Sequence, residues 1–158
     1  MGLKEKEDLL NKKLKEIKAK DIMTRENIVT AKEDDHLAQV ADYMIRNRIS
    51  GMPVVNDEGR VSGVITATDL FLLMDMLKSG KIVENTHSSP YNPTVKFAMT
   101  YIVMKIDPDT GLDEIADIMK LRNIHTLPVY EGETMVGIVG RRDVLKHFYA
   151  ALKSTDSA

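Results

Sequence analysis

Two short segments end in an aspartate where an apolar, β-prone run gives way to a helical pattern. The first is TATD at residues 66–69, and the second is GRRD at residues 140–143. The first turn of a helix offers unpaired backbone N–H groups and a partial positive charge, which favour a phosphate group. The hydroxyls of Thr66 and Thr68 can donate further hydrogen bonds. The first segment therefore suits the phosphate end of a nucleotide.

Asp69 is suited to a different part of the same ligand. Its carboxylate would repel a phosphate, but carboxylate oxygens accept hydrogen bonds well from the two neighbouring hydroxyls of a ribose. The structural alternative is a capping box, in which Thr66 and Asp69 close the start of a helix through reciprocal hydrogen bonds. On residue chemistry alone the capping box is the favoured role. Both roles can coexist, and the family resemblance given below implies that Asp69 binds the ribose hydroxyls.

The second segment keeps the aspartate, as Asp143, but has Gly140, Arg141 and Arg142 in place of the hydroxyl-bearing residues. Arginine binds phosphate through two parallel hydrogen bonds and always carries its charge. We therefore expect this second segment to favour a more highly phosphorylated ligand. The alternative is that both arginines lie on the solvated first turn of a helix.

Both segments belong to an internal repeat with a period of about 75 residues. Residues 41–55 (ADYMIRNRISGMPVV) and 116–130 (ADIMKLRNIHTLPVY) are identical at six of fifteen positions, and the pair Met-Thr occurs at both 23–24 and 99–100. This period is longer than that of common solenoid repeats. One copy of about 60 residues would be marginally stable alone, so two copies sharing an interface are expected.

The pattern of apolar and turn-forming residues predicts the same order of elements, β-α-β-β-α, in each copy. In the first copy it predicts a strand at 28–29, a helix at 36–47 capped by Asp34 or Asp35, strands at 52–55 and 60–66, and a helix at 68–78. In the second it predicts a strand at 101–106, a helix at 112–122 opened by a capping box at 110–113, a hairpin over 127–139 turning at Glu131 and Gly132, and a helix at 142–152.

This pattern divides the chain into five segments. They are an N-terminal amphipathic helix (1–20), a first repeat (21–80), a linker (81–93), a second repeat (94–153) and a frayed tail (154–158). Residues 3–20 carry seven lysines and four acidic residues beside a narrow apolar stripe of Leu3, Leu10, Leu14 and Ile17. We expect the stripe to dock this helix on the rest of the chain. Its basic face leaves a membrane surface or a nucleic acid as alternatives.

The repeated motifs resemble those of a tandem pair of cystathionine-β-synthase (CBS) domains, called a Bateman module. They are DIMT, ISGMPVV and GVITATD in the first copy (21–24, 49–55, 63–69) and FAMT, IHTLPV and GIVGRRD in the second (97–100, 124–129, 137–143). The resemblance covers residues 18–152 and implies an α/β (α+β) fold. It further implies two pseudo-symmetric β-α-β-β-α units packed through their sheets, with an N-terminal helix in addition.

This resemblance implies a sensor that binds adenosine-containing ligands, such as AMP, ADP, ATP or S-adenosylmethionine, in two clefts between the units. It implies that the residues before each Pro-Val strand join the two aspartate segments in these clefts, where backbone and apolar groups receive adenine. Thr24 and Thr100 would close the opposite clefts, with Thr24 nearer Asp143. Beyond the two segments, the expected ligand-binding residues are Ile49, Ser50, Gly51, Met52, Pro53, His125, Thr126, Leu127, Pro128, Thr24 and Thr100.

The resemblance also implies a regulatory homodimer, with residues 71–77 as its packing surface and an effector protein as its target. A ligand would act by favouring one relative arrangement of the units. The alternative is a ligand-free scaffold for dimerisation or for a partner protein, an interpretation that Gly140 supports because it removes a hydroxyl from the second cleft.

Composition narrows the remaining classes of function. The net charge is −2, so no overall basic field favours nucleic acid, and the absence of cysteine excludes disulfides and thiolate chemistry. The four histidines lack metal-ligand spacing, and Asp69 and Asp143 fall in different clefts, so we expect neither a metal nor catalysis. Without an apolar run of about 18 residues or a signal peptide, a cytoplasmic protein is expected.

Overall fold

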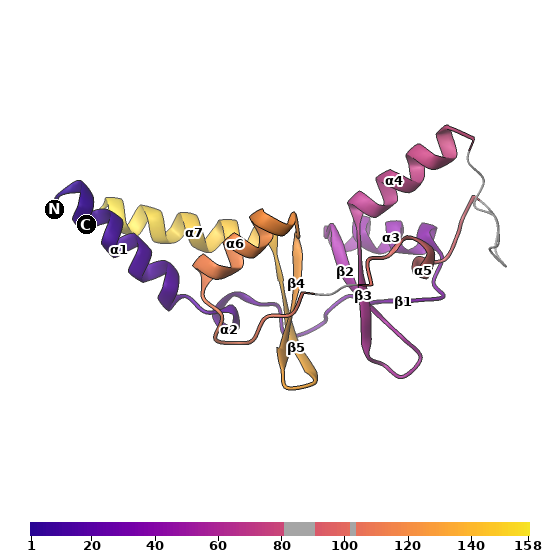
Figure 1. The fold of residues 1–158 in the computed structure, drawn as a ribbon, viewed down its shortest axis with the longest axis horizontal. Coiled ribbons are helices and arrows are strands. Elements are labelled where there is room, and N and C mark those ends of the chain that lie inside the picture. The colour runs from indigo at the N-terminus through magenta and orange to yellow at the C-terminus, as the bar shows by residue number, and fades with distance from the viewer. Residues whose placement is uncertain (81–90, 102–103) are drawn as a thin grey trace. The chain divides into compact units, whose positions relative to one another are not determined.

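The structure is a computed structural model and describes residues 1–80, 91–101 and 104–158. Its elements, labelled in Figure 1, gather into two compact units. Unit 1 is built from Met1–Ile28 and Met104–Ala158, and unit 2 from Val29–Val103. The N-terminal residues therefore belong to the same unit as the C-terminal part of the chain.

Unit 2 contains a three-stranded sheet in the order β1-β2-β3. Its strands are β1 (Ala31–Lys32), β2 (Gly51–Val55) and β3 (Val61–Thr66), and its helices are α3 (Leu37–Asn47), α4 (Ala67–Lys78) and α5 (Val95–Ala98). Strand β1 runs parallel to β2, and β2 and β3 form an antiparallel hairpin. Met52, Val54 and Ile65 are fully buried in one core. Burial of an apolar side chain of this size contributes about 1.5–3 kcal/mol.

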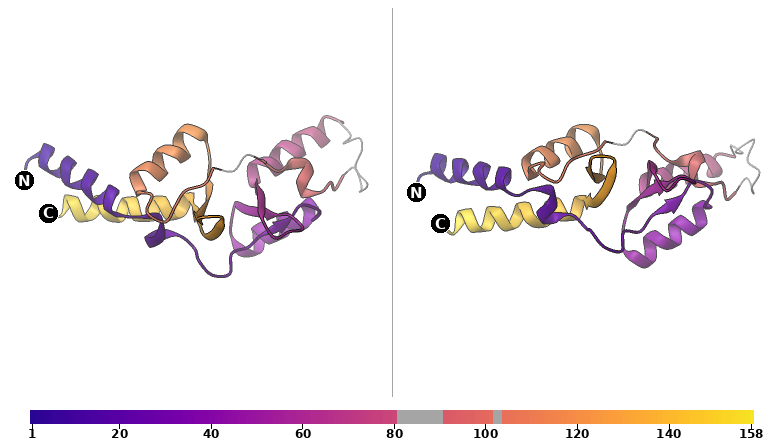
Figure 2. Two further views of the ribbon diagram at one scale, coloured as in Figure 1. Left: turned by 60° about the horizontal axis from the view of Figure 1, so that its bottom comes forward. Right: turned by 90° about the horizontal axis from the view of Figure 1, so that it is seen from below.

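Unit 1 contains a two-stranded antiparallel sheet and most of the helical residues of the chain. Its elements are α1 (Leu3–Glu16), α2 (Ala19–Ile22), α6 (Leu112–Arg122), β4 (Thr126–Glu131), β5 (Thr134–Gly140) and α7 (Arg141–Asp156). Ile115, Leu127 and Val139 are fully buried in its core. Both views of Figure 2 show α1 running beside α7, and the two helices are in direct contact.

The segment that leads into each sequence repeat pairs with the sheet of the other repeat. Thr24 exchanges backbone hydrogen bonds of 2.9 and 3.0 Å with Ile138 in β5, and Thr100 exchanges bonds of 3.0 and 2.9 Å with Val64 in β3. Each compact unit therefore combines residues from both sequence repeats. This is why the units bounded at 28–29 and 103–104 differ from the repeats read along the chain.

Most of the predicted elements are confirmed. The helix expected at 112–122 has those bounds, and both expected hairpins form. The helix expected at 68–78 starts one residue earlier, at Ala67. The second hairpin turns one residue later than expected, because Glu131 still pairs in β4 and Gly132 adopts a positive φ of 61°.

Three local predictions in the repeats are wrong. The first strand lies at Ala31–Lys32 and not at 28–29, because residues 31 and 32 are those that pair with β2. His36, rather than Asp34 or Asp35, is the N-cap of α3; the Asp35 carboxylate instead accepts a 2.8 Å hydrogen bond from the Lys32 N–H. The capping box expected at 110–113 is absent, since the Thr110 hydroxyl accepts from the Asp107 N–H at 3.2 Å.

The N-terminal helix is shorter than expected, and the C-terminal helix is longer. The expected helix over 1–20 breaks after α1, where the carbonyl of Ile17 accepts a 2.8 Å hydrogen bond from Leu112. The tail expected to fray from residue 154 is helical to Asp156, because Thr155 is buried and its hydroxyl donates to the Ala151 carbonyl at 2.9 Å.

Two other predictions fall partly on residues outside the described part of the chain. Of the linker expected at 81–93, only residues 91–93 are described, and residues 102–103 of the strand expected at 101–106 are not described. Ile106, at the end of that expected strand, forms a parallel bridge with Val129 in β4.

Helices α3 and α6 end in the same left-handed geometry but with different residues. Arg48 has φ 52° and ψ 43°, and Asn123 has φ 50° and ψ 43°. Asparagine tolerates this conformation, whereas other residues with a Cβ are strained by about 1 kcal/mol or more. We expect Arg48→Asn to raise the free energy of unfolding by about 1 kcal/mol. Urea unfolding measures this, and the reverse change Asn123→Arg should lower stability by a similar amount; equal midpoints for all three chains would contradict the prediction.

Candidate functional site

In unit 2, the start of α4 lies against the loop that leads into β2. Gly51 pairs with Thr66 in the β2–β3 hairpin, and the Ala67 N–H donates to the Ser50 carbonyl at 2.8 Å. The antiparallel register therefore brings the ISG sequence at 49–51 to the first turn of α4. Two candidate segments that lie about 16 residues apart in the sequence meet at one end of the hairpin.

Thr66 and Asp69 form the capping box that their spacing predicts. Asp69 Oδ2 accepts hydrogen bonds from the Thr66 N–H at 2.8 Å and from Thr66 Oγ1 at 3.0 Å, and the Asp69 N–H donates to Thr66 Oγ1 at 3.4 Å. The single hydroxyl proton of Thr66 is thus directed at Asp69, so it is not available to a phosphate in this arrangement.

Two polar groups beside this box remain open. Among the described residues, no partner donates a hydrogen bond to Asp69 Oδ1, and the Thr68 hydroxyl likewise makes no hydrogen bond. Asp69 is half-buried and Thr68 is exposed. The first turn of α4 therefore presents one carboxylate oxygen and one hydroxyl at the end of the hairpin.

Unit 1 repeats this arrangement at the start of α7. Thr126 pairs with Gly140, and the Arg141 N–H donates to the His125 carbonyl at 3.0 Å. The Gly140 N–H donates to Asp143 Oδ2 at 2.8 Å. Glycine has no hydroxyl, so only this half of the capping box forms.

Two arginines lie at the start of α7. Arg141 and Arg142 are exposed, and neither makes an ion pair or a side-chain hydrogen bond with any residue that the structure describes. His147, one turn further along α7, has its Nδ1 atom 3.0 Å from the carbonyl oxygen of Asp143. The sequence did not single out His147 for this position. Its i, i+4 spacing from Asp143 on a predicted helix was the available signal.

The two threonines of the Met-Thr pairs lie close to these helix starts. Thr24 pairs with Ile138, two residues before the N-cap of α7, and Thr100 pairs with Val64, two residues before the N-cap of α4. Both threonines are exposed. Thr24 thus belongs to the same unit as Asp143, and Thr100 belongs to the same unit as Asp69.

Four residues that were expected to face an adenine ring from the Pro-Val strands are instead buried in the protein. The side chains of Met52 and Leu127 are fully buried in the cores of their units, as is that of Pro53, and Pro128 is buried as well. They cannot offer apolar surface to an adenine ring in this arrangement. What remains accessible in these segments is Ile49, Ser50, Gly51 and His125, with Thr126 only 7% exposed.

Each unit thus gathers its own set of candidate residues. Unit 2 holds Ile49, Ser50, Gly51, Thr66, Thr68, Asp69 and Thr100, and unit 1 holds Thr24, His125, Thr126, Arg141, Arg142 and Asp143.

None of the helices at residues 1–80, 91–101 and 104–158 combines the length and the apolar character that a membrane span requires.

Comparison with known proteins finds the same duplication. The CBS domain family matches the chain twice, at residues 19–75 and 95–150. The chain is 33% identical over 135 residues to MJ1225 and 29% identical over 141 residues to MJ1404, both from Methanocaldococcus jannaschii. These alignments cover 81% and 87% of the chain but 46% and 33% of the two relatives. The chain therefore spans less than half the length of these relatives.

Solved structures share the fold. The crystal structure of MJ1225 has a TM-score of 0.71 at 31% identity, covering 90% of this chain and 51% of that one. The CBS domain pair of protein MJ0100, in complex with 5′-methylthioadenosine and S-adenosyl-L-methionine, has a TM-score of 0.68 at 26% identity, covering 84% and 96%. CBSX2 in complex with AMP has the same fold, with a TM-score of 0.68 at 23% identity, covering 87% and 98%.

The family matches account for more than half of the chain, and they contain both hairpins and the starts of both α4 and α7. The mixed α/β fold with small sheets and an N-terminal helix agrees with that of the solved CBS pairs. The chain therefore belongs to the CBS domain family, and carries two copies of its domain as a tandem pair.

Proposed function

We propose that this CBS pair is a non-catalytic sensor of adenosine-containing ligands. The observation that carries the proposal is the open pair of groups at the start of α4, the Asp69 carboxylate oxygen and the Thr68 hydroxyl, beside the exposed Ser50. The related MJ0100 pair binds 5′-methylthioadenosine and S-adenosyl-L-methionine, both of which contain adenosine. A ribose hydroxyl is a suitable donor for the free carboxylate oxygen.

The two units would bind differently charged ligands. In unit 2, Thr68 and the α4 backbone offer neutral donors, which suit AMP or an uncharged adenosine derivative. In unit 1, the exposed Arg141 and Arg142 offer two guanidinium groups, which suit ADP or ATP. The retained aspartates, Asp69 and Asp143, would hold the ribose in both.

The sensor would work by population shift. A ligand moves a conformational equilibrium only by the difference between its affinities for the two states. Binding would therefore favour one arrangement of the CBS pair, and an effector protein would respond to that arrangement.

We further propose that the chain forms a homodimer. Helix α4 is apolar on several faces, and Phe71, Leu72 and Met74 are 64%, 59% and 53% exposed. A helix that is apolar on more than one face is usually buried on more than one face. This supports the sequence-based expectation that residues 71–77 pack against a second copy.

A ligand-free scaffold is the second candidate. It is favoured by the incomplete capping box of unit 1, where Gly140 offers no hydroxyl to a ligand. Such a scaffold would still dimerise through α4, but no adenosine ligand would stabilise it.

Thermal unfolding with and without ligand separates the two candidates. At a concentration a hundredfold above its dissociation constant, a ligand that binds only the folded chain adds about 2.7 kcal/mol to the unfolding free energy. We expect AMP, ADP or ATP to raise the melting temperature, and 2′-deoxy-AMP to raise it less than AMP because one ribose hydroxyl is missing. No shift with any adenosine ligand, S-adenosylmethionine included, at millimolar concentration would favour the scaffold.

A further inference from the structure

Helix α1 is an addition to the CBS units of this chain. The family matches begin at residue 19 and end at residue 150, so all of α1 and the last turns of α7 fall outside them. Within unit 1, α1 contacts both α6 and α7. Helix α1 therefore covers part of α7, the helix whose first turn holds Arg141 and Asp143.

The apolar attachment of α1 to unit 1 depends mainly on one side chain. Of the 14 residues of α1, all of which the structure describes, only Leu14 is buried, at 9% exposure. Leu10 packs against the same core but is only half-buried. At the other end of the stripe, Leu3 is 90% exposed. A helix with so few buried apolar contacts belongs to the elements that open locally, without unfolding of the whole unit.

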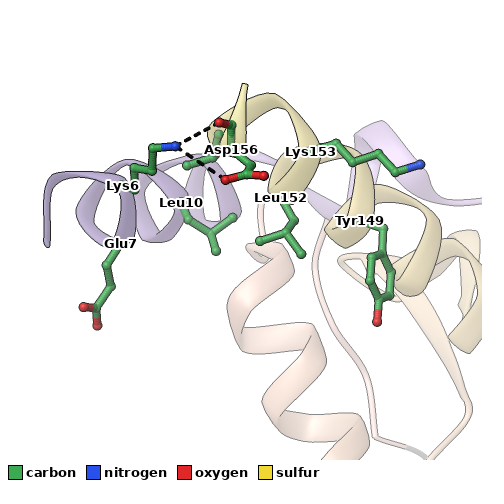
Figure 3. Close-up of a pocket in the computed structure, with 8 residues that line it drawn as sticks. Lys6, Glu7, Leu10, Tyr149, Leu152, Lys153 and Asp156 are labelled. Carbon is green, nitrogen blue, oxygen red and sulfur yellow. Dashed lines mark hydrogen bonds and ion pairs between the residues drawn. The ribbon is translucent and has the colours of Figure 1, made fainter. Parts of the chain in front are cut away.

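Two lysines supply the polar attachment of α1, and both act at the surface. The Lys6 ammonium group donates to the Asp156 carbonyl at 2.9 Å and lies 3.4 Å from the Asp156 carboxylate (Figure 3). The Lys13 ammonium group donates to the Ser154 hydroxyl at 2.8 Å. Asp156 and Ser154 are exposed. Because exposed polar contacts contribute little to stability, these contacts orient α1 more than they hold it.

Two clefts separate α1 from α7 along part of their length. One has a volume of about 530 Å³ and lies between Leu10 of α1 and Tyr149 and Leu152 of α7, whose side chains point to the same side in Figure 3. The other has a volume of about 540 Å³ and lies between Ile17 of α1 and Ala150 of α7. Well-packed elements leave few voids larger than a water molecule. The side chains of α1 therefore fill the available surface incompletely.

The segment that follows α1 is anchored without the help of α1. Ile17 has an extended backbone, with φ −76° and ψ 117°, and its carbonyl accepts a 2.8 Å hydrogen bond from the Leu112 N–H. Ala19 is fully buried, and its N–H donates to the Thr110 carbonyl at 2.8 Å. Helix α1 can therefore swing away at the boundary between Glu16 and Ile17 while α2 remains in the core.

Undocking of α1 would expose a surface on α7 with a defined chemistry. We call it the α1-binding surface, and it consists of Tyr149, Ala151, Leu152, Ser154 and Asp156. Its first three members by type are apolar or aromatic. At its end lie the Asp156 carboxylate and the last carbonyl groups of α7, which carry the negative end of the helix dipole. The surface is therefore complementary to an amphipathic helix that has a basic residue beside its apolar face.

We propose that the α1-binding surface is the docking site for a basic amphipathic helix of an effector protein, and that α1 occupies it as an intramolecular competitor. The incoming helix would carry apolar residues in the positions of Leu10 and Leu14 and a basic residue in the position of Lys6. Apolar side chains larger than those of α1 would fill the two clefts. The inference rests on the proposed regulatory function for the existence of an effector, but not on which ligand the chain binds.

A labelled peptide of residues 1–18 of this chain is the probe, and the full chain is the receptor. Leu14→Asp in the chain puts a charge on the buried position of α1, so this α1 should undock while every residue of α7 is kept. In the parent chain the tethered α1 competes at an effective concentration of about 1 mM, so we expect the peptide to bind the Leu14→Asp chain about tenfold more tightly than the parent chain, or better. Fluorescence anisotropy measures this binding.

The matched control is a peptide that itself carries Leu14→Asp, which should bind neither chain. Equal affinity of the unchanged peptide for both chains, or no binding to either chain, would overturn the proposal.

A second variant loosens α1 at an exposed position and leaves the core untouched. Lys6→Glu in the chain opposes Asp156, so this chain should bind the unchanged peptide about two- to fivefold more tightly than the parent chain does. Adding Asp156→Lys restores an ion pair with the chain's own α1 and repels Lys6 of the peptide. The double variant should therefore bind the peptide no better than the parent chain. A double variant that binds the peptide as tightly as Lys6→Glu would place the peptide elsewhere and overturn the surface.

Sedimentation equilibrium separates the effector helix from a different occupant, the α1 helix of a second copy. We expect the parent chain and the Leu14→Asp chain to associate equally. Weaker association of Leu14→Asp would show that copies exchange α1, and would overturn the effector as occupant. Peptide binding is measured without any adenosine ligand, so a chain that no such ligand stabilises would remove the sensor function and leave these results unchanged.

Discussion

A chain carrying Asp69→Asn will bind an adenosine ligand at one of its two sites about ten- to a hundredfold more weakly than the parent chain. A hydrogen bond to a charged group contributes about 1.5–3 kcal/mol, and the ribose would lose that charge as its acceptor. Asparagine keeps an oxygen that can accept from the Thr66 N–H, so α4 should stay capped. The loss then reports on the ligand and not on folding.

Asp143→Asn is the matched control for this experiment. It changes the equivalent aspartate of unit 1, which also accepts a 2.8 Å backbone hydrogen bond, from Gly140. Titration calorimetry should resolve the two losses as complementary, with each variant weakening a different site. Circular dichroism checks that both variants remain folded. If Asp69→Asn binds every adenosine ligand as the parent does, the assignment of Asp69 to the ribose is wrong.

Substitution of either of two glycines is expected to have a large effect on stability. Gly63 and Gly137 lie against the Met-Thr pairs at 99–100 and 23–24. A Cβ atom on Gly63 would lie 2.5 Å from the Thr100 carbonyl oxygen, and a Cβ atom on Gly137 would overlap the Met23 sulfur. Both glycines lie where the lead segment of one repeat pairs with the sheet of the other. We therefore expect Gly63→Ala and Gly137→Ala each to lower the free energy of unfolding by about 1–3 kcal/mol, through overpacking.

The two variants should differ in degree, and a third provides the control. Gly63→Ala meets a backbone oxygen, which can move little, whereas Gly137→Ala meets a flexible methionine side chain, so Gly63→Ala should be the more damaging. A Cβ atom on Gly140 would have only the Asp143 carboxylate near it, at 3.5 Å, and the φ of Gly140, −99°, is one that alanine adopts readily. Gly140→Ala should therefore change the free energy of unfolding by less than about 0.5 kcal/mol. Denaturant unfolding compares the three chains. Equal stabilities would show that the close approach is not required.

Local signals predicted the elements whose boundaries are set within a few residues. The helix over residues 112–122 follows from the spacing of Leu112, Ile115 and Met119, all of which are buried. The capping box of Thr66 and Asp69 follows from spacing alone, because both partners lie within one turn. These features need no knowledge of distant parts of the chain.

Features that depend on residues far away in the sequence were harder to predict. The position of β1 depends on pairing with Val54 and Val55, so apolar character alone placed the strand too early, at 28–29. The helical end of α7 contains Ser154, Thr155 and Asp156, which are weak helix formers, and α1 holds it through contacts across about 150 residues of sequence. Intrinsic propensity predicted a frayed tail because it could not include that neighbour.

The candidate site shows the same division. Its residues were found from the repeat and from their chemistry, but their hydrogen bonds were not. The Thr66 hydroxyl faces Asp69 instead of open space, and Met52 and Leu127 turn into the cores. Residue type alone could not separate a side chain that meets a ligand from one that supports the backbone beside it.

The exchange of lead segments has a consequence for the covalent integrity of the chain. A break anywhere between Gly80 and Tyr91 would give two fragments, yet each fragment would contribute to both units, since residues 1–28 stay with 104–158 and residues 29–80 stay with 91–103. The two fragments would be joined by the backbone hydrogen bonds of the Thr24–Ile138 and Thr100–Val64 pairs. Neither half of the polypeptide therefore contains all the residues of one compact unit.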